Sequence, residues 1–197
     1  MSQLSFFSAE SVPPAVADLT GLLAGPGQIV LLGSGSQQGA RISAVVDAPW
    51  RAQAIAEMIG EAGLTPEIAK TDENTPLVRT AVDPQLVPIA REWTRGAVKT
   101  VPVQWLPGSR ELRAWALAAG TPEAQDRYLL ELDPHAPDTY ASLAAAMMRV
   151  GIAPTLIGTR SAHPALRISG RRRLSRLVEN VGEPPGDAAA LAHWPRI

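Results

Sequence analysis

The stretch LTGLLAGPG, from Leu19 to Gly27, is matched about half the chain later by LRAWALAAG, from Leu112 to Gly120. Both stretches have nine residues, begin with leucine, end with glycine and close an apolar run of helical spacing. Two copies of one helix-and-glycine motif predict that the chain contains a duplicated unit.

The residues that follow the two nonapeptides repeat at a nearly constant distance. The offset is 88 residues for Gly63 and Gly151, Pro66 and Pro154, and Arg79 and Arg167, and 86 residues for Arg41 and Arg127 and for Asp47 and Asp133. An offset that holds for glycine, proline, arginine and aspartate together indicates an internal repeat.

The first repeat is predicted to run helix, two strands, helix, two strands, helix, and the second follows the same order with a single strand pattern between its first two helices. The first has helical patterns at 11–24, 48–64 and 83–93 and strand patterns at 28–32, 40–46, 66–70 and 77–82. The second has helical patterns at 109–120, 137–152 and 171–182 and strand patterns at 126–133, 154–157 and 165–170. We therefore expect repeats over 11–95 and 109–182, a linker over 96–108, and loose tails over 1–10 and 183–197.

Composition narrows the class of protein. The 197 residues are 46% hydrophobic and 19% charged, which is ordinary for a soluble globular chain. The chain has no cysteine, which excludes disulfides, thiol catalysis and cysteine-bound zinc and fits a reducing, cytoplasmic compartment. No run of about 20 apolar residues occurs, and MSQLSFFSAE lacks the features of a secretory signal, so no membrane association is expected.

The net charge of −1 conceals an asymmetry between the halves. Residues 1–95 carry 6 basic and 10 acidic side chains, whereas residues 96–197 carry 12 and 9. A protein that binds nucleic acid through its overall charge would be far more basic. Any such binding must therefore use a local patch.

This order of elements resembles the LAGLIDADG fold of homing endonucleases, in which two motif helices pack on a pseudo-twofold seam and the strands form a saddle over DNA. The second half is also similar to the LAGLIDADG-like part of WhiA, the actinobacterial sporulation regulator, through LRAWALAAGTPEAQDRYLLELD, VGIAPTLI and LRISGRRRLSRLVENVG. The resemblance spans residues 13–182. It implies an α+β fold of two pseudo-symmetric αββαββα repeats, with antiparallel saddle sheets and helices on one face.

The resemblance also shows what the two nonapeptides lack. Active endonucleases of this fold have an acidic residue at the eighth motif position, where two carboxylates hold the metal ions that activate water. Pro26 and Ala119 stand there, and neither can ligate Mg²⁺. We therefore expect no catalytic residue, no metal and no cofactor. WhiA carries a helix-turn-helix domain after this fold, and no such domain is expected in this sequence, which puts inherited promoter recognition in doubt.

Strand alternation places four arginines on the face of the saddle away from the helices. Arg41 and Arg127 alternate with apolar residues, and Arg79 and Arg167 form a second equivalent pair. Such a set could contact two phosphate strands, or could simply solubilise exposed strands. Acidic residues expected on the same face oppose phosphate: Asp47, Glu131 and Asp133.

A second basic cluster begins the last predicted helix. Arg171, Arg172 and Arg173 are candidates for phosphate contacts, and positive charge at a helix N-terminus opposes the helix dipole, which favours a bound anion. The alternative is a solvated helix face with Leu174 and Leu177 turned to the core.

Other motifs give weaker indications. GSGSQQG (33–39) follows a strand, but it precedes another strand rather than a helix, so it predicts a hairpin and not a dinucleotide site. The three histidines have no ligand spacing: His135, His163 and His193. Trp105 in the linker and Trp194 in the tail are candidates for anchoring a partner.

The N-terminal peptide QLSFF resembles the short motif by which bacterial replication and repair proteins dock on the sliding clamp. Gln3, Leu4 and Phe7 match that pattern, and Phe6 replaces the usual leucine. The alternative is an N-terminal staple on the first helix.

Two functions of different classes follow. The first is a non-catalytic, DNA-associated regulatory module, related to transcription, that uses the saddle arginines and Arg171–Arg173. The second is a protein-interaction or scaffold module without DNA binding, with QLSFF as a possible docking peptide.

Overall fold

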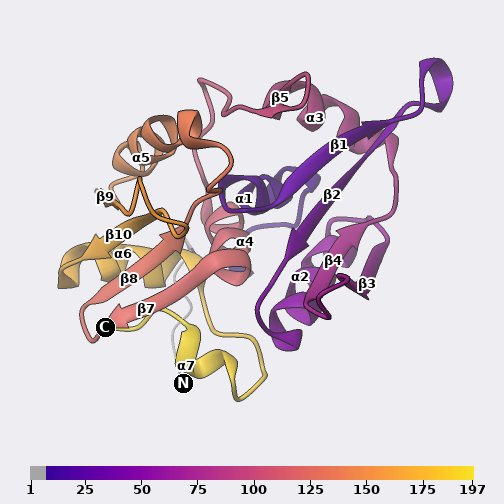
Figure 1. Cartoon of the computed structure of the whole chain (residues 1–197). Coiled ribbons are helices and arrows are strands. Elements are labelled where there is room, and N and C mark those ends of the chain that lie inside the picture. The colour runs from indigo at the N-terminus through magenta and orange to yellow at the C-terminus, as the bar shows by residue number, and fades with distance from the viewer. Residues whose placement is uncertain (1–7) are drawn as a thin grey trace.

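Two four-stranded antiparallel sheets flank a central pair of helices in the computed structural model of the chain, which describes residues 8–197. Figure 1 shows one sheet on either side of the central helices α1 (Thr20–Ala24) and α4 (Ser109–Ala119). The two sheets have the equivalent strand orders β1-β2-β4-β3 and β7-β8-β10-β9. The αββαββα repeat predicted from the sequence is therefore confirmed.

The elements of each half follow the same order. The first half has α1, β1 (Gln28–Leu32), β2 (Gly39–Val45), α2 (Pro49–Glu61), β3 (Pro66–Lys70), β4 (Pro76–Thr80) and α3 (Val87–Trp93). The second half has α4, β7 (Gly120–Ala124), β8 (Arg127–Glu131), α5 (Tyr140–Arg149), β9 (Thr155–Ile157), β10 (Ala165–Ser169) and α6 (Arg171–Val181). Between the halves, β5 (Thr94–Arg95) and β6 (Val98–Lys99) form a small hairpin at the start of the predicted linker.

Strand register reproduces the spacing of the sequence repeat. Ser43 of β2 lies opposite Arg79 of β4, and Leu129 of β8 lies opposite Arg167 of β10. Ser43 and Leu129 therefore occupy equivalent positions in the two sheets, and so do Arg79 and Arg167. Gly63 and Gly151, which follow α2 and α5, both have a φ of +81°, the left-handed conformation that commonly ends a helix.

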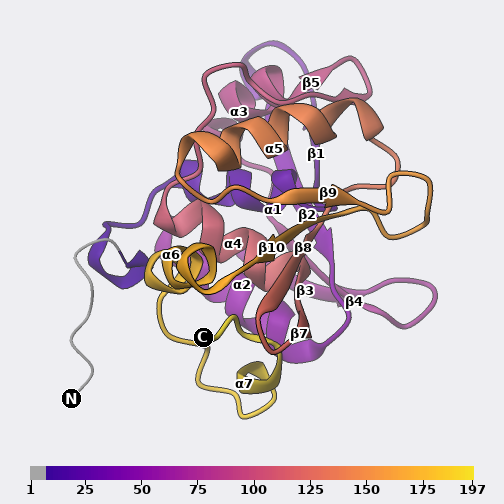
Figure 2. The ribbon, with the colours of Figure 1, turned by 90° about the vertical axis from the view of Figure 1, so that its left-hand side faces the viewer.

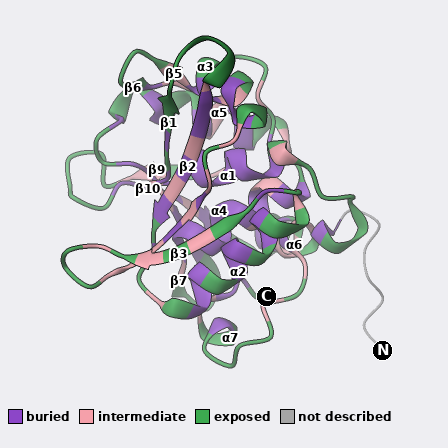
Figure 3. Cartoon of the chain, turned by 90° about the vertical axis from the view of Figure 1, so that its right-hand side faces the viewer, coloured by how far each residue is buried: buried purple, intermediate pink, exposed green. Residues whose placement is uncertain are grey.

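The core lies between the sheets and the helices. Ile42, Ala44 and Val46 in the first half, and Tyr128, Leu130 and Leu132 in the second, are buried, as their alternation along the strands predicts. Figure 3 shows this burial along the inner sides of α2 and α4, with exposed residues on the outer surface. The face of each sheet away from the helices is called the open face below.

The first predicted helix, 11–24, is wrong in its first half. Only Thr20–Ala24 is α-helical; single turns of 3-10 helix at Ala9–Ser11 and Val16–Leu19 precede it. The cause is Pro13-Pro14, because a residue before proline avoids the helical region. Val12 is accordingly extended, with φ −101° and ψ 129°.

Strand β7 was not predicted from its own sequence, GTPEA. Its residues have weak strand propensity, and Pro122 is tolerated because β7 is an edge strand with an irregular register at Pro122–Ala124.

The C-terminal segment is packed rather than loose. It contains α7 (Ala190–His193), and Ala190 and Trp194 are buried. Trp194 Nε1 donates to the carbonyl of Gly182 at 2.8 Å, and the Tyr128 hydroxyl donates to the carbonyl of His193 at 3.0 Å. Figure 2 shows this segment folded back beneath the sheets. Trp194 is therefore a core residue and not an exposed anchor.

Candidate functional site

The seam between the halves is a close contact of the two motif helices. A Cβ built on Gly21 would lie 2.9 Å from the Cβ of Ala114 and would overlap the backbone carbonyl of Glu111. The helices can therefore approach this closely only because residue 21 is glycine. The seam brings the C-terminal ends of α1 and α4 together, since a Cβ built on Gly25 would lie 3.5 Å from the Cβ of Ala119.

A buried lysine caps the end of α1. Lys99 of β6 is only 8% exposed, and its ammonium donates to the carbonyl of Gly25 at 2.9 Å. The same ammonium lies 2.8 Å from a carboxylate oxygen of Asp133, which is 3% exposed. A cation suits this place because the last carbonyls of a helix carry partial negative charge.

A buried arginine caps the end of α4. Arg51 of α2 donates to the carbonyls of Ala116, Leu117 and Gly120 at 3.1, 2.9 and 2.7 Å. Its Nε lies 2.7 Å from a carboxylate oxygen of Asp47. Arg51 belongs to the first half and the carbonyls to the second, so this cap joins the two halves.

The two capping cations are paired with equivalent aspartates. Asp47 follows β2 and Asp133 follows β8, at the offset of 86 residues that relates the two strands. Asp133 does not stand on the open face, contrary to expectation. It accepts from Lys99, from the Gln28 amide at 2.5 Å and from the backbone N–H of His135 at 2.9 Å.

The pKa of the Asp133 carboxyl reflects this pairing. Burial raises this pKa, and the hydrogen bond and charge of Lys99, together with the His135 and Gln28 donors, outweigh burial and leave the pKa below its ordinary value. Asp133 is therefore stabilised in its carboxylate form, and the ammonium of Lys99 neutralises its charge. No group of three or more histidine, aspartate or glutamate residues suited to a metal ion occurs within 8–197.

Most saddle arginines already have acidic partners. Arg79 Nε bonds Glu67 Oε2 at 2.8 Å, and Arg167 reaches across β8 to Glu123 Oε1 at 2.5 Å. Arg127 is exposed and lies 4.0 Å from Asp126. Within the described chain, Arg41 alone of the four has neither a hydrogen bond nor an ion pair, and its Nε is buried without a partner.

The open face of the first sheet is also partly apolar. Val30 and Val45 are 49% and 48% exposed, and Leu32 is exposed beside them. Val30 lies opposite Arg41 in the register of β1 and β2, so the unpaired arginine has an exposed apolar neighbour on this face. This face therefore combines one free cation with exposed apolar surface.

The arginines that begin α6 differ from those of the saddle. Arg171, Arg172 and Arg173 are exposed, and their side chains make no ion pair or hydrogen bond with residues 8–197. They line an open hollow of about 500 Å³ together with Gly151, Ser169 and Gly170. The expected cluster at this helix N-terminus is present, and its charge is unneutralised.

Sequence reasoning missed both capping cations. Lys99 stands in the predicted linker, and Arg51 stands in an ordinary helical pattern; no local signal marks either.

Trp105, a candidate partner anchor, instead packs edge-on against Trp93, with 5.1 Å between the ring centroids, and donates to the Thr20 hydroxyl at 3.0 Å. Gln3, Leu4, Phe6 and Phe7 lie outside the described residues, and no described helix is long and apolar enough to cross a membrane.

Comparison with solved structures identifies the architecture. The N-terminal LAGLIDADG domain of DUF199/WhiA superposes with a TM-score of 0.57 over 94% of this chain and 98% of that one. The chain has the LAGLIDADG fold. Sequence identity to that domain is 12%. No protein-family model matches the sequence, and no curated protein is similar to it in sequence.

Two further solved structures are similar to this chain. The homing endonuclease I-WcaI, bound to its DNA recognition sequence, has a TM-score of 0.58 and 12% identity over 92% of this chain and 83% of that one. Full-length WhiA from T. maritima has a TM-score of 0.58 and 14% identity over 86% of this chain. The match spans only 55% of that longer protein.

Proposed function

We propose that this protein is a non-catalytic LAGLIDADG module that binds duplex DNA in a regulatory role. The observation that carries the proposal is that Lys99 and Arg51 cap the C-terminal ends of the two motif helices, α1 and α4. Where cleaving relatives are expected to present two metal-binding carboxylates, this chain presents helix ends neutralised by Lys99 and Arg51. Each of these cations is also paired with an aspartate, so the carboxylates of Asp133 and Asp47 are held by Lys99 and Arg51 and are not free to ligate a divalent cation.

Support for DNA as the partner comes from the fold and from the free arginines. I-WcaI is bound to DNA in its structure, and the saddle arginines of this chain occupy equivalent positions in the two sheets. Among the arginines that the sequence singled out for DNA, those without a described partner are Arg41 and the three that begin α6. We therefore assign the phosphate contacts chiefly to those four arginines, with Arg79 and Arg167 contributing less because each already bonds a glutamate.

Fluorescence anisotropy of a labelled duplex tests this function. With a duplex of about 30 base pairs, the logarithm of affinity should fall with the logarithm of salt concentration with a slope of about −3 to −4, one unit per phosphate contact. The triple variant R171A/R172A/R173A should lower the slope by two to three units, about one per arginine. R149A removes an arginine whose side chain donates to the carbonyls of Val103 and Trp105, so it is the matched control and should bind like the parent.

The same assay tests for catalysis when Mg²⁺ is added. We expect the duplex to stay intact, and cleavage that depends on Mg²⁺ would contradict the proposal. Retained binding without cleavage, lost in the triple variant, supports a DNA-binding role without catalysis.

A second candidate function is a protein-interaction module. The exposed apolar residues on the open face and the glutamate-paired arginines favour it, because a protein partner tolerates apolar surface better than phosphate does. Absence of DNA binding at low salt would select this candidate. Affinity capture with the QLSFF peptide, compared with a peptide in which Gln3 and Phe7 are alanine, would then test clamp docking.

A further inference from the structure

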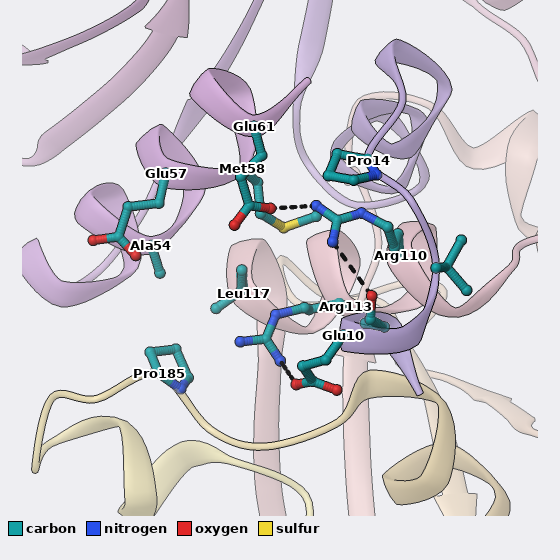
Figure 4. Close-up of a pocket in the computed structure, with 12 residues that line it drawn as sticks. Glu10, Pro14, Ala54, Glu57, Met58, Glu61, Arg110, Arg113, Leu117 and Pro185 are labelled. Atoms are coloured by element: carbon teal, nitrogen blue, oxygen red, sulfur yellow. Dashed lines mark hydrogen bonds and ion pairs between the residues drawn. The ribbon is translucent and has the colours of Figure 1, made fainter. Parts of the chain in front are cut away.

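A cavity of about 380 Å³ lies between α2 and α4. Figure 4 shows its lining, which also includes the segment before α1 and Pro185 of the C-terminal segment. Four stretches that are far apart in sequence therefore enclose one space. The DNA-binding proposal does not use it.

One side of the cavity is formed by a guanidinium that is fixed in place. Arg113 Nη1 donates to Glu10 Oε1 at 3.2 Å and to the carbonyls of Val181 and Glu183 at 2.7 and 2.6 Å. The group also lies over the ring of Trp194, 5.1 Å from its centroid. These contacts leave Arg113 little freedom, so its orientation is set before any ligand arrives.

The other edge of the same guanidinium has no acceptor. All three hydrogen bonds of Arg113 use Nη1, and Nε and Nη2 donate to no atom of residues 8–197. Figure 4 shows Nη2 pointing toward the side of the cavity where Ala54 and Glu57 lie. Nε and Nη2 together form the two-donor edge that binds a carboxylate in a bidentate manner.

The neighbouring arginine is already satisfied. Arg110 Nε bonds Asp18 at 2.6 Å, Nη1 bonds the carbonyl of Ala9 at 3.3 Å, and Nη2 bonds Glu61. Burial lowers the pKa of Arg113, and the charge of Arg110 lowers it further despite the attraction of Glu10 and other glutamates. Arg113 is therefore the cation of this cavity whose charge is least compensated.

The rest of the cavity favours an aliphatic ligand with a positive end. Ala54, Met58 and Leu117 are buried and form an apolar surface. Glu57 is exposed on the side toward which Arg113 Nη2 points, and its only hydrogen bond within the described chain comes from Gln53 at 3.3 Å. Glu57 can therefore accept an ammonium group without giving up a strong partner.

We propose that this cavity binds a small aliphatic zwitterion, with its carboxylate on the Nε–Nη2 edge of Arg113, its chain against Met58 and Leu117, and its ammonium near Glu57. This site is independent of the proposed DNA binding. If the cavity binds no zwitterion, the DNA binding measured by anisotropy is unaffected. If the protein binds no DNA, the expected zwitterion binding is equally unaffected.

Isothermal titration of the full chain with 6-aminohexanoate tests the proposal, with hexanoate and hexylamine as probes that carry one charge each. We expect 6-aminohexanoate to bind and each singly charged probe to bind about tenfold more weakly or not at all. R113K keeps a cation but loses the two-donor edge, and E57Q loses only the negative charge. Each should weaken 6-aminohexanoate by about tenfold.

Two controls separate binding from folding. A54L fills the cavity and should abolish binding, whereas R95K changes an exposed arginine that also bonds backbone carbonyls and should bind like the parent. E57Q is a surface change, so it reports on binding even if R113K disturbs the fold. No heat with 6-aminohexanoate at millimolar concentration overturns the proposal. Equal binding of hexanoate, or unchanged binding by E57Q, would overturn it as well.

Discussion

Lys99 and Asp133 form a buried ion pair at the C-terminal end of α1, and each residue neutralises the buried charge of the other. We expect K99M to lower the free energy of unfolding by about 3–5 kcal/mol, because it leaves the Asp133 carboxylate buried without a cation. Urea denaturation measures this loss. The double variant K99M/D133N should lose less than the sum of the two single variants; additivity would show that the pair is not coupled.

The same pair predicts a pH dependence. The pKa of Asp133 is lower in the folded protein than its ordinary value of 3.8, so its contribution to stability is complete above that pH and is lost as pH falls toward the folded-state pKa. The difference in unfolding free energy between the parent and D133N should therefore narrow below pH 3.8. Urea denaturation from pH 7 downward checks this, and a constant difference would contradict it.

The inward and outward residues of β2 and β8 could be predicted because alternation along a strand is a local property. Arg41 and Arg127 are where period two places them. Asp133 was predicted wrongly, because the chain turns after β8 and a lysine from another segment binds the carboxylate. Neither the turn nor its partner leaves a pattern in the surrounding sequence.

At the scale of elements, the seam depends on one glycine. We expect G21A to lower the free energy of unfolding by about 3 kcal/mol, since its Cβ would meet the backbone of α4. G60A is the matched control, because a Cβ there meets nothing within 4 Å and alanine favours the interior of helix α2. Thermal unfolding should show a lower midpoint for G21A and an equal or higher one for G60A.

Elements with a clear period were predicted closely, and those shaped by proline or by tertiary contact were not. The patterns of 28–32 and 66–70 coincide with β1 and β3. Helix α1 is shorter than its pattern because Pro13 and Pro14 interrupt it, and β7 forms because β8 offers a pairing edge. The packed C-terminal segment could not be foreseen, because Trp194 and Ala190 are buried against residues distant in sequence.

At the scale of the whole molecule, the two halves should fold only together. Arg51, Lys99 and Arg110 each bond groups in the other half or between the halves, and α1 packs chiefly on α4 across the seam. We expect a fragment of residues 1–95 to show no cooperative unfolding by circular dichroism, while the full chain unfolds in one transition. A monomeric fragment that melts cooperatively would show that the seam is dispensable.

The arrangement of the caps also bears on how a symmetric protein could be built from this chain. The offset that pairs Pro49 with Pro137 places Thr139 where the first half has Arg51. A tandem fusion of two first halves would therefore carry an arginine for each motif helix, whereas a fusion of two second halves would carry none. Of the two halves, the first is the better template for an ancestral dimer or a designed, symmetric relative.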